Sequence, residues 1–148
     1  MREIKFRGVT PTKRWITGSL IYHGEQPRIE FVTRRHPDDN RVLDTDWAYV
    51  DEETVGQFTG LTDKNGKEIY EGDIIHVNGN TFDKDFGVVT YHKNGYFYID
   101  DSFGEFPRSC VKPIGDFFNS ISRNDFFQGM EFYVIGNIHD NKELLKDI

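Results

Sequence analysis

Short runs in which apolar and polar residues alternate recur along most of this chain. In residues 2–7, Ile4 and Phe6 alternate with charged residues, a pattern that predicts a strand with one buried face. Similar patterns predict further strands at residues 15–22, 28–33, 47–50, 58–61, 68–70, 74–77, 86–91, 96–100, 109–111 and 132–135. The chain is therefore expected to be mainly β, and its first third is expected to form a small β-meander.

Turn-forming dipeptides separate these runs. Asn65-Gly66 and Asn94-Gly95 each lie between two predicted strands, and Asn-Gly is typical of a type I′ hairpin turn because both residues tolerate a positive φ. Gly18, inside a predicted strand, indicates a bulge. Helical patterns are few. They predict a turn at residues 51–54, a helix at 116–128 and a short final helix at 142–146, capped by Asn141.

The segment 34–46 contains only two aliphatic residues, Val42 and Leu43, and is expected to form an exposed polar connection. Its first half also invites a metal or phosphate interpretation. However, a single histidine, His36, beside carboxylates lacks the ligand spacing that a transition metal requires, so we favour the exposed loop.

The order of elements from residue 74 to residue 111 is strand, loop, strand, tight hairpin, strand, turn and short strand. This order is typical of a small β-barrel and fits an SH3-like barrel of five strands, in which free strand edges are removed by curling. We expect a single domain over residues 1–148. Its parts are residues 1–50, the meander and connection; 51–140, the SH3-like barrel; and 141–148, the C-terminal helix.

The composition is compatible with one small soluble domain. Hydrophobic residues make up only 36% of the 148 residues, but aromatic residues make up 15%, so the core is expected to use a few large rings. The single cysteine, Cys110, excludes an intramolecular disulfide and is typical of a reducing compartment. The chain lacks an apolar secretion signal and any apolar run of about 18 residues, so we expect a cytoplasmic protein without membrane contact.

The net charge of −7 is unevenly distributed. Residues 1–35 carry eight Lys/Arg and three Asp/Glu, a net charge of +5, and residues 36–148 carry ten and twenty-two, a net charge of −12. We interpret the basic segment as a surface that docks on the acidic part of the same chain or of a neighbouring copy. Contact with phosphate is the alternative, but the acidic part would repel nucleic acid.

Known catalytic and cofactor motifs are absent from the sequence. It contains no phosphate-binding loop, no dinucleotide fingerprint and no nucleophile elbow. Residues 63–71 resemble a calcium loop only in part, because Gly66 falls at the fourth position and not the sixth. A metal site built from His76 and His92 with Asp73 or Asp85 would require a favourable strand register. We therefore expect no catalytic residue, no cofactor and no bound metal, and we interpret Cys110 as a strand residue.

The residues that best fit a binding surface are aromatic and basic. Tyrosines around a lysine on a small β-barrel can stack on bases or proline rings, although the same face can also pack on the meander or on another subunit. Arginines of the basic segment can contact phosphate. The candidate binding residues are Arg28, Arg34, Arg35, Tyr91, Lys93, Tyr96 and Tyr98.

The central run of residues 53–61 and 63–73, ETVGQFTGL followed by DKNGKEIYEGD, resembles the YopX family. The stretches at 2–7, 134–138 and 144–145 agree, so the resemblance covers nearly the whole chain, with 117–129 the part least like the family pattern. This resemblance implies a phage or prophage protein that contains an SH3-like barrel and acts in the host bacterial cell. It supplies no catalytic residues.

Three hypotheses about function follow. The first is a non-enzymatic phage accessory protein that binds itself, as a homo-oligomer, or a host or phage protein. The second is a nucleic-acid-binding module that uses the basic N-terminal segment and the tyrosine face. The third is an enzyme, for which the sequence offers no site. We favour the first, because an aromatic-rich barrel whose segments carry opposite charges is suited to contact with a protein or with a second copy. The turn residues of the central run are explained by the scaffold alone.

Overall fold

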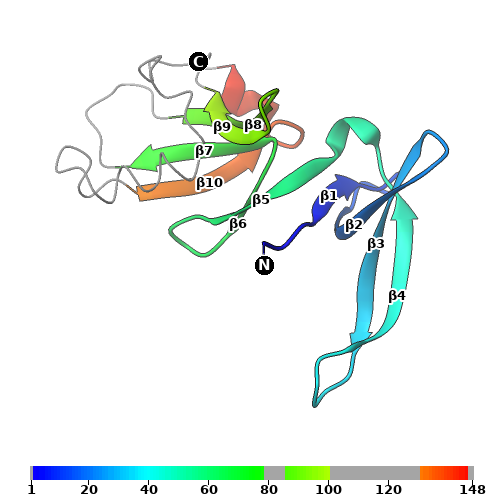
Figure 1. The fold of residues 1–148 in the computed structure, drawn as a ribbon. Coiled ribbons are helices and arrows are strands. Elements are labelled where there is room, and N and C mark those ends of the chain that lie inside the picture. Colours follow the sequence, from blue (N-terminus) through cyan, green and yellow to red (C-terminus); the bar gives the residue numbers. More distant parts are fainter. Residues whose placement is uncertain (1, 79–85, 101–130, 147–148) are drawn as a thin grey trace. The chain divides into compact units, whose positions relative to one another are not determined.

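The structure, a computed structural model, describes residues 2–78, 86–100 and 131–146, and it divides the chain into two compact units (Figure 1). The first unit is Met1–Phe58 and the second is Thr59–Ile148. Every strand pairing in the described residues for which a register is defined is antiparallel. The prediction of a mainly-β protein is therefore confirmed.

The first unit is a meander of four strands that is joined by the start of a fifth. The strands follow the hydrogen-bonded order β4-β3-β2-β1-β5. Their bounds are β1 Phe6–Val9, β2 Trp15–His23, β3 Gln26–Arg35, β4 Val42–Tyr49 and β5 Gly56–Thr62. The last of these strands passes the boundary of the two units, since β5 continues beyond Phe58.

Alternation along these strands gives the first unit one apolar face. Ile16, Ile29 and Val50 are buried at its centre. Around them pack the half-buried residues Phe6, Leu20, Phe31, Ala48 and Val55. The remaining side chains of each strand point away from this core, because successive residues of a strand face opposite sides of the sheet.

Strand β2 changes its partner at Gly18. Residues up to Gly18 pair with β1, and residues from Ser19 onward pair with β3. A Cβ atom at Gly18 would lie 1.9 Å from the carbonyl oxygen of Glu30, so only glycine permits this close approach. The irregularity that the sequence predicts at Gly18 is thus the point where β2 passes over β3.

The segment 34–46 is not the exposed loop that the sequence predicts. β3 continues to Arg35, a turn covers residues 36–41, and β4 begins at Val42, so most of the segment is a β-ribbon. The prediction was wrong because backbone pairing between the two strands compensates for the lack of apolar residues. We call the hairpin made by β3, the turn and β4 the arm (Figure 1).

A single 3₁₀ turn, η1 Glu52–Thr54, follows the arm, where the sequence predicts a helical turn. Asp51 caps it, because its Oδ1 accepts the backbone N–H of Glu53. The Thr54 hydroxyl accepts the backbone N–H of Val9 and donates to the carbonyl of Asp51. These bonds fix the path of the chain from the arm into β5.

The second unit contains the end of β5 and a second sheet. The second sheet has the order β10-β7-β8-β9. The bounds of its strands, and of β6, which pairs with β5, are β6 Glu68–Tyr70, β7 Asp73–Asn78, β8 Phe86–His92, β9 Tyr96–Asp100 and β10 Glu131–Asn137. Within the described residues this sheet is open, and no pairing of β9 with β10 closes it into the predicted barrel.

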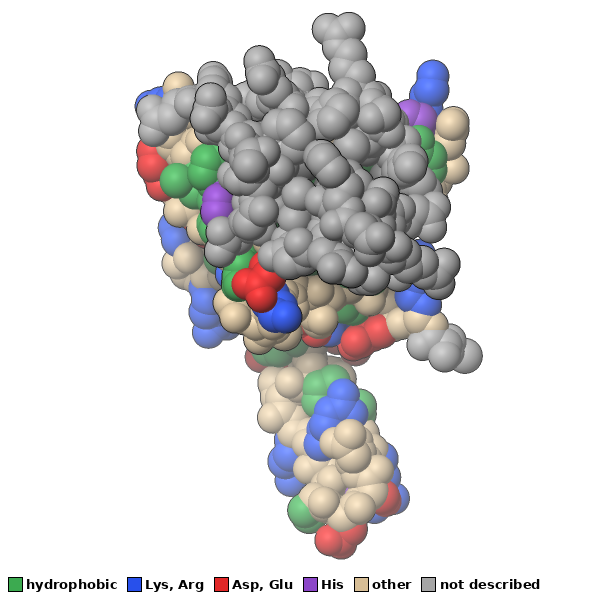
Figure 2. All heavy atoms as spheres, turned by 90° about the vertical axis from the view of Figure 1, so that its left-hand side faces the viewer, with side chains coloured by type: hydrophobic (Ala, Val, Ile, Leu, Met, Phe, Trp, Pro, Cys, Tyr) green, Lys and Arg blue, Asp and Glu red, His purple; other side chains and the backbone are tan. Residues whose placement is uncertain are grey.

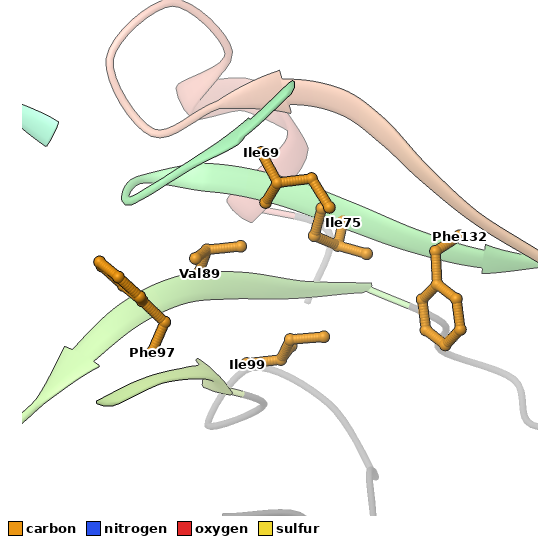
Figure 3. Packing of buried hydrophobic residues seen from close by; sticks show 6 residues of the cluster. All are labelled: Ile69, Ile75, Val89, Phe97, Ile99 and Phe132. Atoms are coloured by element: carbon orange, nitrogen blue, oxygen red, sulfur yellow. The ribbon is translucent and has the colours of Figure 1, made fainter. Parts of the chain in front are cut away.

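One cluster of side chains forms the core of the second unit. Ile69 and Ile75 are almost completely inaccessible, and Leu61 and Val134 pack against the cluster from its edge. Figure 3 shows the six central side chains between the strands that carry them. They are Ile69, Ile75, Val89, Phe97, Ile99 and Phe132.

Both Asn-Gly turns differ from the predicted type I′. Gly66 and Gly95 have positive φ angles of 79° and 88°, but neither Asn65 nor Asn94 has a positive φ. In the first turn, Gly66 donates to the carbonyl of Asp63, as in a type I turn that ends in a left-handed glycine. The hairpins themselves are confirmed, but the loops are longer than two residues.

The predicted C-terminal helix is absent from the described residues, and Lys142–Leu145 form one 3₁₀ turn, η4. Asn141 makes no side-chain cap to this turn. Its Oδ1 instead accepts the backbone N–H of Asn137, so the residue expected to start a helix supports the end of β10.

Several predictions concern residues outside those that the structure describes. They are the strand at 109–111, the helix at 116–128, the cysteine Cys110 and the possible ligand Asp85. In the parts that are described, no helix has the length and apolar character needed to cross a bilayer.

Candidate binding surfaces

The arm presents one regular face on the side away from the core of the first unit. Successive cross-strand pairs of β3 and β4 alternate between two faces, and the register shifts at two places between Val32 and Arg35. Ile29 and Ala48, which belong to the core, lie on one face. The other face, which we call the arm face, is formed by the pairs Arg28–Tyr49, Glu30–Trp47, Val32–Thr45 and Arg35–Val42.

The outer part of the arm is a two-stranded ribbon. Among the described residues, β2 pairs with β3 only as far as Glu30, which lies opposite Ser19, and β3 then pairs with β4 alone. Figure 2 shows the arm as a narrow projection on which basic, acidic and hydrophobic side chains are interspersed. A ribbon of two strands has little stability of its own in water.

Four large hydrophobic side chains of the arm are exposed to solvent. Val32 is 39% exposed, Val42 47%, Leu43 40% and Trp47 45%. Three of them, all except Leu43, belong to pairs of the arm face. Apolar groups gathered on one projecting element are characteristic of contact surfaces, unlike single exposed residues, which are common.

The base of the arm face is organised by two aromatic rings. The guanidinium of Arg28 lies over the ring of Trp47, 4.7 Å from its centre, and Trp47 meets Tyr49 edge to face at 5.2 Å. Nε of Arg28 is buried and has no hydrogen-bond partner in the described part of the chain. The guanidinium of Arg28 thus lies over the tryptophan ring and is partly buried. It does not extend into solvent, as contact of Arg28 with a phosphate would require.

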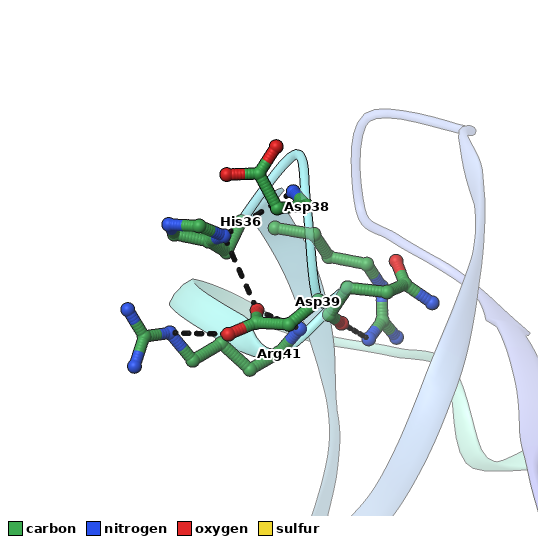
Figure 4. Close-up of polar contacts among 6 residues, drawn as sticks. His36, Asp38, Asp39 and Arg41 are labelled. Atoms are coloured by element: carbon green, nitrogen blue, oxygen red, sulfur yellow. Dashed lines mark hydrogen bonds and ion pairs between the residues drawn. The ribbon is translucent and has the colours of Figure 1, made fainter.

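The arginines near the tip of the arm are already engaged. Arg34 Nε lies 2.5 Å from Asp44 Oδ2, on the face opposite the arm face, and the guanidinium of Arg35 donates to the carbonyl of Asn40. Figure 4 shows the tip, where Asp39 pairs with His36 at 3.3 Å and with Arg41 at 3.5 Å. Arg34 and Arg41 are thus paired with acidic side chains, whereas the partner of Arg35 is an uncharged carbonyl.

Strand pairing removes the basic character that the sequence suggests. Residues 26–49 together carry four arginines and five acidic residues, a net charge of −1. The basic residues of β3 lie beside acidic residues of the turn and of β4, as in the pair Arg34 and Asp44. A surface of this kind offers no sustained positive field to a polyanion.

The remaining candidate residues lie in the second unit, on β8, β9 and the turn between them. Tyr96 and Tyr98 share a face with His92, whose ring stacks on Tyr96 at 4.6 Å and meets Tyr98 edge to face at 5.6 Å. Tyr91 lies on the other face, where it contacts the buried Phe97 at 5.0 Å. The three tyrosines therefore do not form one surface.

The turn residue Lys93 is exposed and completes this group. Nδ1 of His92 accepts the backbone N–H of Asn94, which fixes the imidazole against the turn. The pKa of Tyr98 is raised, first by burial and then by the nearby charge of Asp100. Sequence analysis missed His92 as the centre of the stack, although its position directly opposite Tyr96 follows from the short hairpin loop.

Ligand positions for a metal are not found in the described residues, where no three His, Cys, Asp or Glu side chains converge. His76 contacts the ring of Phe86 at 5.0 Å. In the partial calcium loop, Asp63 Oδ1 accepts the N–H groups of Asn65 and Lys67, and Oδ2 accepts that of Val134. Both oxygens of Asp63 therefore bind backbone and shape the hairpin.

The described residues form a mainly-β fold with two antiparallel sheets. Comparison with protein-family models identifies the family to which the chain belongs. The family model described as YopX protein matches residues 5–146. The chain therefore belongs to the YopX family, as the resemblance of its central run predicts.

Comparison with solved structures supports the same architecture. The chain is similar to the protein EF1440 from Enterococcus faecalis, with a TM-score of 0.55 and 23% sequence identity. The alignment covers 98% of this chain and 99% of that chain. At this identity the likeness concerns the fold alone. Among curated proteins, none matches the chain.

Proposed function

We propose that this chain is a non-enzymatic binding module, an accessory protein of a phage or prophage that contacts a protein through the arm. Membership of the YopX family supports the phage setting in the cytoplasm of a bacterial host. The exposed apolar side chains of a two-stranded ribbon support the binding role. The second observation carries the proposal, because a ribbon with solvent on both faces gains stability when a partner covers it.

Contact with a protein is better supported than contact with nucleic acid. A nucleic-acid surface needs free cations beside exposed rings. Here Arg34 is paired with Asp44, and Arg28 covers the ring of Trp47. A partner with mixed charge and an apolar centre matches the arm better than a phosphate backbone does.

The finer architecture belongs to the same proposal. We infer that the second unit completes an SH3-like barrel around the core of Ile75, Val89 and Phe97. The meander of the first unit then serves to present the arm. Backbone hydrogen exchange with assigned resonances tests this architecture, since a closed barrel protects both outer strands of the second sheet and an open sheet leaves one of them unprotected.

The binding role is tested by removing the apolar character of the arm without changing its shape. The double variant Val32→Thr, Val42→Thr keeps β-branched side chains and so retains strand propensity. Cross-linking in cells that carry the chain, followed by quantitative mass spectrometry, compares the variant with wild type. We expect the variant to lose the protein cross-links that map to residues 28–49.

A matched control is available on the second unit. Ile135, on β10, is 37% exposed, and Ile135→Thr makes the same kind of change away from the arm. We expect this control to retain the cross-links. If the arm variant and wild type give the same cross-linked partners at the same yield, the arm does not bind them and the proposal fails.

A further inference from the structure

The arm face has a charge pattern that is complementary to itself. From the base to the tip, its four pairs carry a cation with a tyrosine, an acid with a tryptophan, a valine with a threonine, and a cation with a valine. The carboxylate of Glu30 has no hydrogen bond or ion pair within the described residues. Glu30 and Arg35 flank the central Val32, and the cross-strand pair of each lies two pairs away from the Val32–Thr45 pair, Glu30 on the basal side and Arg35 on the tip side.

From this pattern we infer that the arm face binds the arm face of a second copy of the chain, in an antiparallel, face-to-face arrangement. The inference rests on the proposed binding role of the arm and names its partner. The two copies are related by a two-fold axis that runs across the strands and passes near Val32. Such an interface is isologous, since each copy contributes the same residues.

The two-fold axis brings opposite charges of the two copies together and also brings their apolar groups together. When β3 lies antiparallel on β3 of the other copy, Glu30 of each copy faces Arg35 of the other, so the ion pair occurs twice. On β4, Trp47 of each copy faces Val42 of the other, and the Val32 side chains meet at the axis. Apolar groups at the centre with charged groups around them are the usual composition of a protein interface.

The low net charge of the arm permits this contact between two acidic chains. Each chain carries a net charge of −7, so two copies repel each other on average, whereas residues 26–49 carry only −1. Contact through the arm therefore joins two nearly neutral segments of otherwise acidic chains. The stacked Arg28 and Trp47 add a rigid base to the face, which lowers the ordering cost of association.

Charge reversal tests this pairing directly, with dissociation constants of the purified chain measured by sedimentation. Glu30→Lys places a lysine opposite Arg35, and Arg35→Glu places an acid opposite Glu30. We expect each variant alone to dimerise at least about tenfold more weakly than wild type, because two like-charged contacts replace two ion pairs. An equimolar mixture of the two variants restores both ion pairs, so we expect a heterodimer near wild-type affinity.

The control changes charge by the same amount on the opposite face. Asp46 pairs with Phe31 on the core-side face of the arm, and Asp46→Lys is expected to leave dimerisation within about twofold of wild type. Circular dichroism of every variant confirms that the sheets are intact. This keeps a loss of folding distinct from a loss of association.

Two outcomes overturn the inference. One is a wild-type chain that stays monomeric up to about 1 mM, a concentration at which even weak pairs are visible. The other is a dimer whose mixed variants associate no better than each variant alone. The binding role of the arm is tested separately. It is rejected if the Val32→Thr, Val42→Thr variant keeps the cross-links of wild type. A monomer that keeps arm-dependent cross-links to another protein therefore retains the proposed function and rejects the self-pairing.

Discussion

Asp63 accepts a hydrogen bond from the backbone N–H of Val134, 71 residues further along the sequence. Its other carboxylate oxygen accepts the N–H groups of Asn65 and Lys67 in its own turn. One nearly buried side chain thus joins the β5–β6 hairpin to β10. The backbone N–H of Lys64, which donates to the carbonyl of Phe132, reinforces the same connection.

Replacing Asp63 by asparagine is expected to destabilise the second unit by about 2–3 kcal/mol. The amide keeps one oxygen for the turn, but its NH₂ group then faces the N–H of Val134, so a buried donor loses its acceptor. Urea unfolding followed by circular dichroism measures the loss. Asp38→Asn at the exposed tip of the arm is the matched control, with an expected change below about 0.5 kcal/mol. Equal effects of the two substitutions would contradict the structural role of Asp63.

Alanine at Gly18 is expected to destabilise the first unit by roughly 1–3 kcal/mol, because its methyl group would overlap the backbone of Glu30. Both tryptophans, Trp15 and Trp47, belong to this unit, so their fluorescence reports its unfolding selectively.

Gly24→Ala separates steric overlap from backbone strain. Gly24 has a φ of +66°, and no atom lies within 4 Å of the position that an alanine methyl group would take there. Alanine at this position therefore lowers the free energy of unfolding only through its left-handed backbone conformation, by about 1 kcal/mol. If Gly18→Ala unfolds at the same urea concentration as wild type, β2 does not pass as close to β3 as the structure indicates.

Arg34→Ala is expected to change the free energy of unfolding by less than about 1 kcal/mol, despite the short contact with Asp44. Both side chains are more than half exposed, at 65% and 52%, and solvent screens such pairs. Denaturation monitored by tryptophan fluorescence gives the value, with Asp44→Ala as the reciprocal variant. A loss of several kcal/mol in either variant would show that the pair holds the ribbon together.

Tyr133→Phe is expected to raise the pKa of Glu131 towards its ordinary value. The hydroxyl of Tyr133 donates to Glu131 and is the main cause that lowers this pKa, with a smaller contribution from Lys64. Carbon-13 NMR of the carboxyl group against pH measures the change. An unchanged titration of Glu131 in the variant would show that the hydrogen bond does not persist in solution.

The hydrogen bond between Tyr133 and Glu131 also makes the free energy of unfolding depend on pH. Because the folded-state pKa of Glu131 is lowered, its contribution is present above the unfolded-state pKa and is lost as the pH falls through the folded-state value. The pKa of Tyr133 is raised, so its contribution is present below the unfolded-state pKa and is lost as the pH rises through the folded-state value. Tyr133→Phe removes the contribution of Tyr133 and reduces that of Glu131, which melting temperatures across the pH range can detect.

Strands bounded by clear turn residues were predictable from the sequence, but alternation alone was not sufficient. Residues 2–7 were predicted as a strand with Ile4 on the buried face, whereas β1 begins at Phe6 and Ile4 is 67% exposed. The strand at 96–100 has the predicted bounds, because Gly95 ends the turn before it and alternation with Phe97 and Ile99 fixes its buried face. The type I′ turns were not predictable in detail, because Asn-Gly permits positive φ at both residues without requiring it. Here Gly66 and Gly95 alone adopt it.

The outer part of the arm, residues 34–46, escaped sequence analysis because its composition gave no signal of strands, whereas strands at 28–33 and 47–50 were predicted. Val42 and Leu43 are the only aliphatic residues in a polar segment, and neither is buried. The strand there depends on backbone pairing with β3, whose register is shifted twice and so hides the alternation. Of the predicted binding residues, Arg28 and Arg35 belong to the arm face, whereas Glu30, Val32 and Trp47 were not identified.

Net charge along the sequence also misled the interpretation of the basic segment. The sum over residues 1–35 is positive, but antiparallel pairing brings Asp44 beside Arg34, a residue from the other side of the chosen boundary. Charge in a β-ribbon must therefore be counted across paired strands and not along the chain.

The two register shifts near the tip of the arm have a consequence for solubility. β4 lies at the end of its sheet, where unpaired backbone groups can recruit further strands without limit. The shifts between Val32 and Arg35 interrupt the regular ladder, and Asp44 and Asp46 place two negative charges along the same strand. Edge-to-edge growth into fibres is thereby disfavoured, even though the ribbon exposes hydrophobic side chains.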